Sequence, residues 1–315
     1  MAQPISTRKA LREWRIYLLV LPALVMIATF AYFPAASAIY HSFFDWSGGE
    51  VKRYTGLDNF RRAWNDAVLW RSFGVIAILV VANVIKLIPS ILLAVLIHRL
   101  HSARWQYWYR VGVVLPMVVP GLVFLFIWKF FLDPNVGALN RLLDLTGGRT
   151  LLVWIDQLFG WDVFRPDQPF GWLSQPDLII PSLILWGFPW IGAVGVLLYL
   201  AGLQSIGAEV YEAAEIDGVT SWQRLRHIEL PLILTQIRLT LVLLIIGTLQ
   251  GYGLQLLLLG DTGGPDGRGM VPGLWMYNRA FSSGEFGYAC ALGLILFVAI
   301  LVLTMINNRL VRVDK

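Results

Sequence analysis

The sequence has 315 residues, of which 57% are hydrophobic and 14% are charged, whereas a soluble domain carries about 25% charged residues. This composition excludes an ordinary soluble domain and predicts a membrane protein. The net charge of +5 is too small for this length to indicate nucleic-acid binding, and the single cysteine, Cys290, excludes an internal disulfide and a thiolate metal cluster.

The first expected element is an uncleaved spanning helix. Basic residues before position 16 and a run of small residues after Pro34 superficially resemble a cleavable signal peptide. The apolar run from Ile16 to Ala38 is longer than the apolar core of a signal peptide, which reaches about 15 residues, and has the length of a membrane span.

Six apolar runs are each long enough, at about 20 residues, to cross a bilayer. They cover residues 16–40, 73–97, 107–131, 178–203, 232–259 and 286–306. Prolines recur inside these runs or at their ends and indicate kinked helices around a cavity. The sequence therefore predicts an all-α membrane protein, with residues 1–315 forming a single transmembrane domain.

The basic residues predict the orientation, because cytoplasmic loops carry an excess of Lys and Arg. Residues 1–15, residues 98–110 and the tail with Arg309, Arg312 and Lys315 are basic, so both termini are expected in the cytoplasm. The loop 132–177 holds six Asp against three Arg and is expected outside. The loop 43–71, with five basic and four acidic residues, departs from this rule, but the other segments together still favour the same orientation.

A long polar passage, Tyr211 to Pro231, separates the fourth and fifth runs. Glu209 to Asp217 consists of strong helix formers, and Gly218 can take the left-handed turn that ends a helix. Thr220 and Gln223 have the capping-box spacing that begins a second helix. The passage therefore predicts two short helices joined at a bend, on the cytoplasmic side.

Ala213 and Ala214 leave one side of the first short helix almost bare, so another protein could approach its backbone closely. The pattern Glu212-Ala213-Ala214-x-x-Asp217-Gly218, followed by Ile228-x-Leu230-Pro231, resembles the EAA motif of ABC-importer permeases. In that family the passage is the coupling helix, which docks into a groove on the ATP-hydrolysing subunit. The resemblance implies a type I ABC importer permease fold, with six transmembrane helices and coupling helices over residues 209–226, between spans four and five.

The resemblance also implies a role for each motif residue. Glu212 and Asp217 would be polar contacts or packing anchors, Ala213 and Ala214 the docking face, and Gly218 the bend. The positions that depart from the family's usual pattern are Val219, Leu225 and Thr235. Apolar swaps of this kind adjust the packing against the ATPase rather than abolish it.

Other segments are similar to the sugar-importer branch, which includes the maltose, lactose and glycerol-3-phosphate permeases. They are Tyr54-x-Gly56-Leu57-Asp58-Asn59-Phe60, Asp133-Pro134-x-x-Gly137-x-x-Asn140, Thr262-Gly263-Gly264-Pro265 and Gly287-Tyr288-Ala289. The Thr-Gly-Gly-Pro turn resembles that of the first of two non-identical permeases. The implied partners are a second, homologous permease subunit forming a heterodimer, two copies of an ATP-binding subunit that holds ATP and Mg, and an extracytoplasmic solute-binding protein. The implied location is the cytoplasmic (inner) membrane of a bacterium or archaeon.

The sequence holds no Gly-x-x-x-x-Gly-Lys-Ser/Thr nucleotide loop, so the chain is not expected to be the ATPase or to carry a cofactor. His98 and His101 lie three positions apart without a third ligand, which indicates snorkelling interfacial residues rather than a metal site. No nucleophile, base and orienting acid occur in a defensible arrangement, so no catalytic residue is expected.

Polar groups at membrane depth nominate a substrate path, because they are costly unless they face a cavity. The candidates are Asn83, Lys86, Trp186, Trp190, Thr248, Gln250, Tyr252 and Gln255. Gln250 lies near the position of substrate contacts in the maltose-type relatives, with Thr248 as the alternative because the distance to the Gly-Gly-Pro turn differs by two residues. Lys86 is expected to bond helix carbonyls rather than an anionic solute. The tryptophan pair is expected to pack helices more often than to form a sugar platform.

The expected function is a permease subunit that imports a sugar or related polyol by alternating access, driven by a partner ATPase. The alternative is an ion-coupled secondary transporter or a channel that acts without an ATPase. That alternative requires buried acid or arginine relays, and Lys86 is almost the only deep ionisable residue. A membrane scaffold is a third reading, but a scaffold needs no polar lining in the fifth span.

Overall fold

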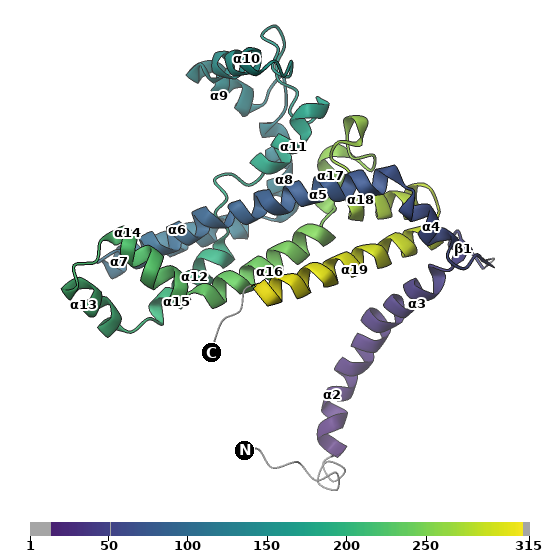
Figure 1. Ribbon diagram of the computed structural model, residues 1–315, viewed down its shortest axis with the longest axis horizontal. Coiled ribbons are helices and arrows are strands. Elements are labelled where there is room, and N and C mark those ends of the chain that lie inside the picture. The colour runs from purple at the N-terminus through teal and green to yellow at the C-terminus, as the bar shows by residue number, and fades with distance from the viewer. Residues whose placement is uncertain (1–13, 51, 311–315) are drawn as a thin grey trace. The chain divides into compact units, whose positions relative to one another are not determined.

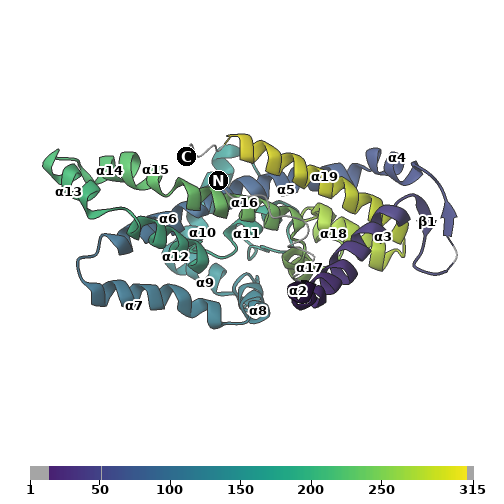
Figure 2. The same cartoon turned by 90° about the horizontal axis from the view of Figure 1, so that it is seen from below.

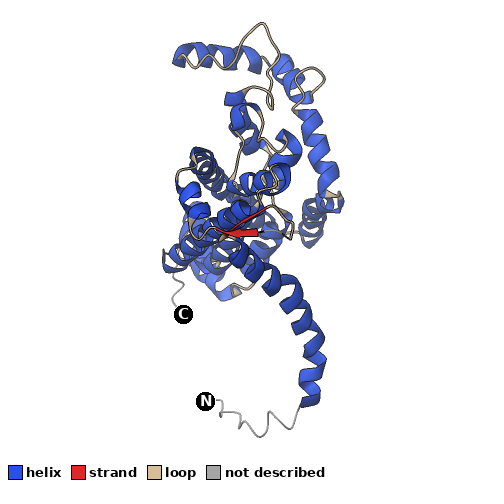
Figure 3. Cartoon of the chain, turned by 90° about the vertical axis from the view of Figure 1, so that its right-hand side faces the viewer, coloured by secondary structure: helices blue, strands red, loops and turns tan. Residues whose placement is uncertain are grey.

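A computed structural model describes residues 14–50 and 52–310. The basic residues predicted to place the N-terminus in the cytoplasm, Arg8, Lys9 and Arg12, lie outside the described residues, as do Arg312 and Lys315 of the tail. The described chain is almost entirely helical (Figure 3). Its strands are β1 (Phe44–Trp46) and β2 (Lys52–Tyr54), which pair antiparallel with Phe44 opposite Tyr54.

The described residues form two compact units, residues 14–65 with 279–295 and residues 66–278 with 296–310. In the first unit, a long apolar helix precedes the β hairpin. It consists of α2 (Trp14–Ile27), the π-helical turn η1 (Ala28–Tyr32) and α3 (Phe33–His41). The stretch Leu18–His41 buries none of its most apolar window, which suits a helix that faces lipid.

The short helix α4 (Asp58–Trp64) is fastened to the start of α19 (Phe286–Leu310) within the first unit. The Arg62 guanidinium donates two hydrogen bonds of 2.9 Å to the Glu285 carboxylate and lies 4.0 Å from the centre of the Tyr288 ring. The Asn59 side chain donates to the carbonyls of Ser42 and Phe44, both at 2.9 Å. These bonds hold the hairpin, α4 and the start of α19 together.

The second unit contains the remaining helices (Figure 1). In chain order they are α5 (Ala67–Ile85), α6 (Leu87–His98), α7 (Ala103–Val114), η2 (Leu115–Val118), α8 (Gly121–Phe131), α9 (Ala138–Thr146), α10 (Gly148–Phe159), α11 (Pro176–Leu185), α12 (Ala193–Gln204), α13 (Ala208–Ile216), α14 (Ser221–Arg224), η3 (Leu225–Glu229), α15 (Leu230–Leu232), α16 (Leu234–Gln250), α17 (Gly253–Leu259), η4 (Pro265–Gly267) and α18 (Pro272–Tyr277). The π-helical turn η5 (Asn278–Ser282) links α18 to the first unit.

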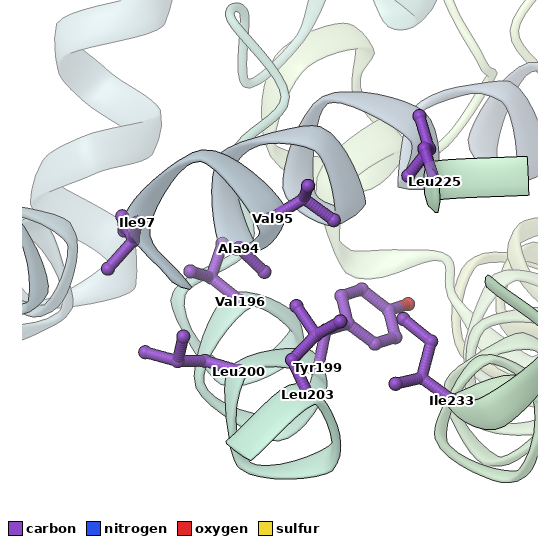
Figure 4. Close-up of a cluster of buried hydrophobic side chains, with 9 residues drawn as sticks. All are labelled: Ala94, Val95, Ile97, Val196, Tyr199, Leu200, Leu203, Leu225 and Ile233. Atoms are coloured by element: carbon purple, nitrogen blue, oxygen red, sulfur yellow. The ribbon is translucent and has the colours of Figure 1, made fainter. Parts of the chain in front are cut away.

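The core of the second unit is the packing of α6 against α12, with α16 packed against α5 (Figures 1 and 4). Nine buried residues form the cluster in Figure 4: Ala94, Val95, Ile97, Val196, Tyr199, Leu200, Leu203, Leu225 and Ile233. The fully buried Ala94 lies on α6, and a Cβ at Gly195 on α12 would stand 3.9 Å from the Ser90 Cβ of α6. A second cluster, around Trp128 and Phe170, supports the segment between α8 and α11.

Three described helices are long and apolar enough to cross a membrane alone: Leu18–His41, Ala67–His98 and Phe286–Ile306. They agree with the first, second and sixth predicted spans. Three bent pairs of helices pass the same test jointly, so the described chain has up to six candidate spans.

The third, fourth and fifth predicted runs are not continuous helices, contrary to a simple reading of their apolar length. The helix α7 with η2 meets α8 at an 88° bend, where Pro116 and Pro120 interrupt the helix (Figure 2). Between α11 and α12 the residues 186–192, which include Pro189, are non-helical. The fifth run breaks after Gln250, at Gly251 and Tyr252. Kinks at prolines were predicted, and those at Pro116, Pro120 and Pro189 are confirmed.

Candidate functional site

A cavity of about 630 Å³ lies in the second unit, between α5–α6, the link from α11 to α12, and the junction of α16 with α17. Seven of the eight predicted path residues line it: Asn83, Lys86, Trp186, Trp190, Thr248, Tyr252 and Gln255. Gln250 does not line the cavity, because its side chain lies on an exposed face of α16. Of the two alternatives in span five, Thr248 is thus the one at the cavity.

The cavity forms where two helical stretches are interrupted beside a third that continues. Residues 186–192 separate α11 from α12, and Gly251 with Tyr252 separates α16 from α17, whereas Lys86 at the junction of α5 and α6 keeps a helical conformation. Non-helical backbone at membrane depth is tolerated where it is buried in protein or lines an aqueous cavity, since its freed polar groups need partners. We refer to this space as the helix-break cavity.

Lys86 and Asn83 place polar contacts along the α5–α6 wall. The Lys86 ammonium lies 3.4 Å from the Trp186 carbonyl, to which it donates, and 5.8 Å from the centre of the Trp190 ring. This carbonyl belongs to the interrupted segment, so Lys86 bonds a backbone carbonyl outside a helix rather than the helix carbonyls that we expected. Asn83 donates to the Thr248 hydroxyl at 3.0 Å and thereby joins α5 to α16.

The two tryptophans line the cavity and also pack the structure around it. The Trp186 ring lies 5.7 Å from that of Trp128 and 5.4 Å from that of Phe124. The Trp190 indole donates to the Ile184 carbonyl at 3.2 Å. Ser90 on α6 bonds the same link twice, since its hydroxyl donates to the Trp190 carbonyl at 3.3 Å and accepts from the Gly192 amide at 2.9 Å. Both rings therefore have partners within the protein while they line the cavity.

Two glycines give the helix-break cavity its width. Gly247 on α16 and Gly253 at the start of α17 both line it, and a Cβ at either position would meet no atom within 4 Å. Next to them, the Tyr252 ring stacks on that of Tyr277, with centroids 5.5 Å apart. The cavity thus combines open space, an aromatic face and hydrogen-bonding groups.

A second candidate site is the polar passage after α12, which we call the elbow: residues 208–229, comprising α13, the bend at Gly218, α14 and η3. Gly218 has a φ of +69°, the left-handed conformation that favours glycine, so the predicted bend is confirmed. Thr220 and Gln223 form the predicted capping box, with the Thr220 amide donating to Gln223 at 2.9 Å and the Gln223 amide to Thr220 at 3.3 Å.

The motif residues are divided between the two sides of α13. Glu212, Ala213 and Asp217 are exposed, whereas Ala214 is buried against the protein, with 6% of its surface exposed. The two alanines therefore do not form one docking face as predicted, because a helix turns by about 100° per residue and separates neighbours. The exposed surface of the elbow instead carries apolar residues that the sequence reading missed, Ile216 on α13 at 87% and Trp222 on α14 at 66% exposure.

Long apolar helices that break around a polar cavity are typical of a membrane transport protein. The family model described as "binding-protein-dependent transport system inner membrane component" matches residues 90–312. The chain belongs to this family. It is therefore an ABC-importer permease, a transport component rather than an enzyme, as the sequence predicted.

Relatives of known annotation match along nearly the whole chain. A probable ABC transporter permease of Pyrococcus horikoshii is 29% identical over 92% of this chain and 93% of its own. The lactose transport system permease protein LacF of Rhizobium radiobacter is 29% identical over 95% of this chain and 94% of its own. The multiple sugar-binding transport system permease protein MsmF of Streptococcus mutans is 26% identical over 97% of this chain and 98% of its own.

Two solved structures share the fold. One is a bacterial ABC transporter that imports the acidic polysaccharide alginate, with a TM-score of 0.76 and 23% identity over 98% of this chain and 99% of that one. The other is the alginate transporter in complex with its pentasaccharide-bound periplasmic protein, with a TM-score of 0.78 and 22% identity over 97% of this chain and 96% of that one. The permease fold is thus common to all three chains.

Proposed function

We propose that this chain is the first of two non-identical permease subunits of an ABC importer for a sugar or related polyol. Six spans cross the inner membrane, and the solute passes through the helix-break cavity by alternating access. The cavity carries the proposal: at about 630 Å³ it falls within the 300–1,000 Å³ typical of small-molecule sites, and it offers amide, hydroxyl and aromatic groups. Sugars bind through hydrogen bonds to their hydroxyls and through their C–H faces stacked on aromatic rings.

The relatives support the solute class. They include permeases for lactose, for multiple sugars and for diacetylchitobiose. The alternative of an ion-coupled transporter or channel receives no such support, because the family is one of binding-protein-dependent transport. Lys86, the deep ionisable residue on which an ion relay would depend, is engaged with a backbone carbonyl.

In this proposal the elbow is the cytoplasmic coupling helix between spans four and five. Its exposed Glu212, Ala213, Asp217, Ile216 and Trp222 form the surface that meets a groove on one of two ATP-binding subunits, which hold ATP and Mg. When the two ATPases close, they draw the elbows together and turn the cavity from the cytoplasm toward the outside, where a solute-binding protein delivers the solute. The exposed apolar side chains favour a protein partner, since such residues gain by burial at an interface.

Substitution at the bend tests the proposal. Gly218→Val places a β-branched residue in the left-handed conformation, which costs about 1–2 kcal/mol and favours a different angle between α13 and α14. Gly147→Val is the matched control, because Gly147 has a φ of +72° and equally open surroundings but joins α9 to α10. The whole complex, reconstituted in vesicles, is assayed for ATP hydrolysis and for uptake of a panel of labelled saccharides that includes lactose.

We expect Gly218→Val to lower the uptake per ATP hydrolysed, while Gly147→Val leaves this ratio unchanged. Accumulation of a saccharide by the permeases without the ATP-binding subunits would contradict the proposal. An unchanged ratio in Gly218→Val would contradict the coupling role of the elbow.

A further inference from the structure

The fully buried carboxylate of Glu229, at the end of the elbow, lies between two arginines. The Arg99 guanidinium donates to both of its oxygens, from Nη2 to Oε2 at 2.6 Å and from Nε to Oε1 at 3.1 Å. Arg224 donates from Nε to Oε1 at 3.1 Å. Two-point bonding of this kind fixes the geometry of an ion pair as well as its strength. The pair joins residues 130 positions apart in the chain.

The same contacts close a ring that joins both helices of the elbow to the end of α6. Arg99 also donates to the carbonyl of Ser221, the first residue of α14, at 2.9 Å. The Arg224 guanidinium lies 4.2 Å from the centre of the Tyr211 ring on α13, and the Tyr211 hydroxyl lies at hydrogen-bond distance, 3.1 Å, from His98 Nε2. His98 and Arg99 are adjacent at the end of α6. We call these five residues, His98, Arg99, Tyr211, Arg224 and Glu229, the clamp.

Burial and the nearby Glu229 carboxylate raise the pKa of Tyr211, so its hydroxyl stays protonated around neutral pH and remains able to bond His98. The two arginine side chains are about one-quarter exposed and carry one positive charge more than the carboxylate neutralises. That excess charge faces water, which makes the buried position of Glu229 tolerable.

Apolar packing alone fastens the elbow weakly. Of the nine residues in the cluster of Figure 4, Leu225 is the one that the elbow supplies, whereas α6 and α12 supply seven. The α6–α12 pair is thus held by seven buried apolar side chains of this cluster and the elbow by Leu225, with a further small share from Ala214. The polar clamp is therefore the principal tie between the elbow and α6.

The helix α6 leads from the clamp to the helix-break cavity. Its 12 residues rise roughly 18 Å. At the far end lie Lys86, which bonds the Trp186 carbonyl, and Ser90, which bonds both sides of the link before α12. A displacement of the elbow that moves Arg99 thus reaches the walls of the cavity along a single rigid helix.

We propose that Arg99, Glu229 and Arg224 are positioning residues that transmit the movement of the elbow into α6 and so into the cavity. This inference rests on the proposed function, in which the elbow receives the force of ATP-driven closure. An ion pair that only satisfied the buried Glu229 would have no such effect, since the loss of Arg99 would then lower the amount of folded complex without changing how the assembled complex responds to ATP.

The test uses the assembled importer with its ATP-binding subunits and binding protein, in vesicles, and needs no identified solute. A thiol introduced by Gly247→Cys in a Cys290→Ser background reports access to the cavity, because Gly247 lines it and has room for a side chain. The labelling rate with a membrane-impermeant maleimide from the cytoplasmic side is measured before and after trapping with ATP and vanadate. Trapping is expected to slow the labelling, since it closes the cavity to the cytoplasm.

Arg99→Met removes the two-point bond. We expect it to reduce the trapping effect on the labelling rate by at least about fivefold, the lower end of usual coupling between sites, while ATP hydrolysis continues. Arg99→Lys keeps the charge but cannot form the fork, so it should give an intermediate loss. The matched control is Arg104→Met, an exposed arginine five positions further on, which should leave the trapping effect unchanged.

If Arg99→Met does not assemble, Arg99→Lys and Tyr211→Phe decide the matter, since both keep the bulk of the clamp. A full trapping effect in the assembled variants would overturn the clamp. The clamp would also be overturned if a variant lowered the rate of ATP hydrolysis and the trapping effect on labelling in equal proportion. Such a result indicates only a smaller amount of folded complex. If Gly218→Val abolishes the trapping effect and Arg99→Met does not, the elbow couples and the clamp is wrong. If neither does, the coupling role that the proposed function gives to the elbow fails.

Discussion

Two acids among the described residues are buried, and each finds its partners in a different way. Glu229 meets two arginines, whereas Asp156 on α10 accepts from the backbone amides of Val163 and Phe164 at 3.1–3.2 Å. A carboxylate held by main-chain amides fixes a local loop, here the turn after α10. A carboxylate held by distant side chains fixes separate segments to one another. The chemistry at Glu229 therefore suits transmission, and that at Asp156 suits a static local loop.

Asp133 provides a test at the level of one residue. Its carboxylate accepts from the amides of Asn135 and Val136 at 2.9 and 3.0 Å, and the bond from Val136 is the main cause that lowers its pKa. A lowered pKa means that the turn is stabilised above the unfolded value, about 3.9, and loses this support as the pH falls through the folded value.

We therefore expect Asp133→Asn at neutral pH to speed amide exchange in residues 133–137, because the variant has a weaker acceptor for the two amides. Hydrogen–deuterium exchange followed by mass spectrometry measures this rate. Asp167→Asn, an exposed acid in the same outer loop, serves as the control and should exchange normally. Equal exchange in the two variants would show that the Asp133 bonds do not hold the turn.

Many of the individual residues could be predicted from the sequence. Thr220 with Gln223 and the bend at Gly218 follow from local rules of helix ends, and local rules do not depend on the rest of the fold. The polar cavity residues follow from the cost of polarity at membrane depth. The direction in which each side chain points does not follow from the sequence alone, because a break in a helix changes the direction of every residue after it. Gln250 lies outside the cavity that Thr248 lines for a simpler reason: the two residues are two positions apart on α16, which places them on opposite sides of the helix.

The clamp could not be predicted with confidence from spacing, because Arg99 and Glu229 are far apart in the chain. A signal was nevertheless present. Glu229 stands between apolar residues just before a span, where an acid is costly unless it is paired, and Arg99 follows the end of the second span. An acid in such a position predicts a basic partner at the same membrane surface.

At the scale of elements, the interruptions of the helices matter most. Apolar length by itself indicates continuous third, fourth and fifth spans, because hydropathy reports side-chain polarity and carries no information on the direction of the backbone. The local signals lay in the sequence: Pro116 and Pro120, the segment around Gly187 and Pro189, and Gly251. The positions of the breaks could therefore be predicted from the sequence. That the breaks lie around one cavity could not, because it depends on how the helices pack.

The capping box is the element-scale feature with the clearest consequence. Thr220→Ala removes the side-chain acceptor of the Gln223 amide at the start of α14, and such a loss costs about 1 kcal/mol. We expect faster amide exchange in residues 221–224, measured by mass spectrometry in the membrane-embedded complex. Thr304→Ala is the control, because that hydroxyl bonds a carbonyl within α19 and caps no helix. Unchanged exchange at 221–224 would mean that docking rather than the cap holds α14.

At the scale of the whole molecule, the orientation in the membrane remains a prediction from the basic residues. Single thiols in a Cys290→Ser background test it. Trp222→Cys on the elbow should react with an impermeant maleimide only from the cytoplasmic side, and Leu145→Cys at the end of α9 only from outside, since both side chains are highly exposed. Labelling of Trp222→Cys from outside would invert the proposed topology and remove the elbow from reach of an ATPase.

At Gly247 a small loss of helix stability accompanies a gain of open space in the cavity. Glycine inside a helix is less stable than alanine by roughly 0.5–1 kcal/mol, and α16 accepts this loss at a position where a methyl group would extend into open space beside the solute route. Gly253 offers the same room at the start of the next helix. Side chains of increasing bulk at these two positions would narrow the passage in steps without moving the backbone. In the proposed function, the upper size limit of the solute can thus change without any change in the elbow or the clamp.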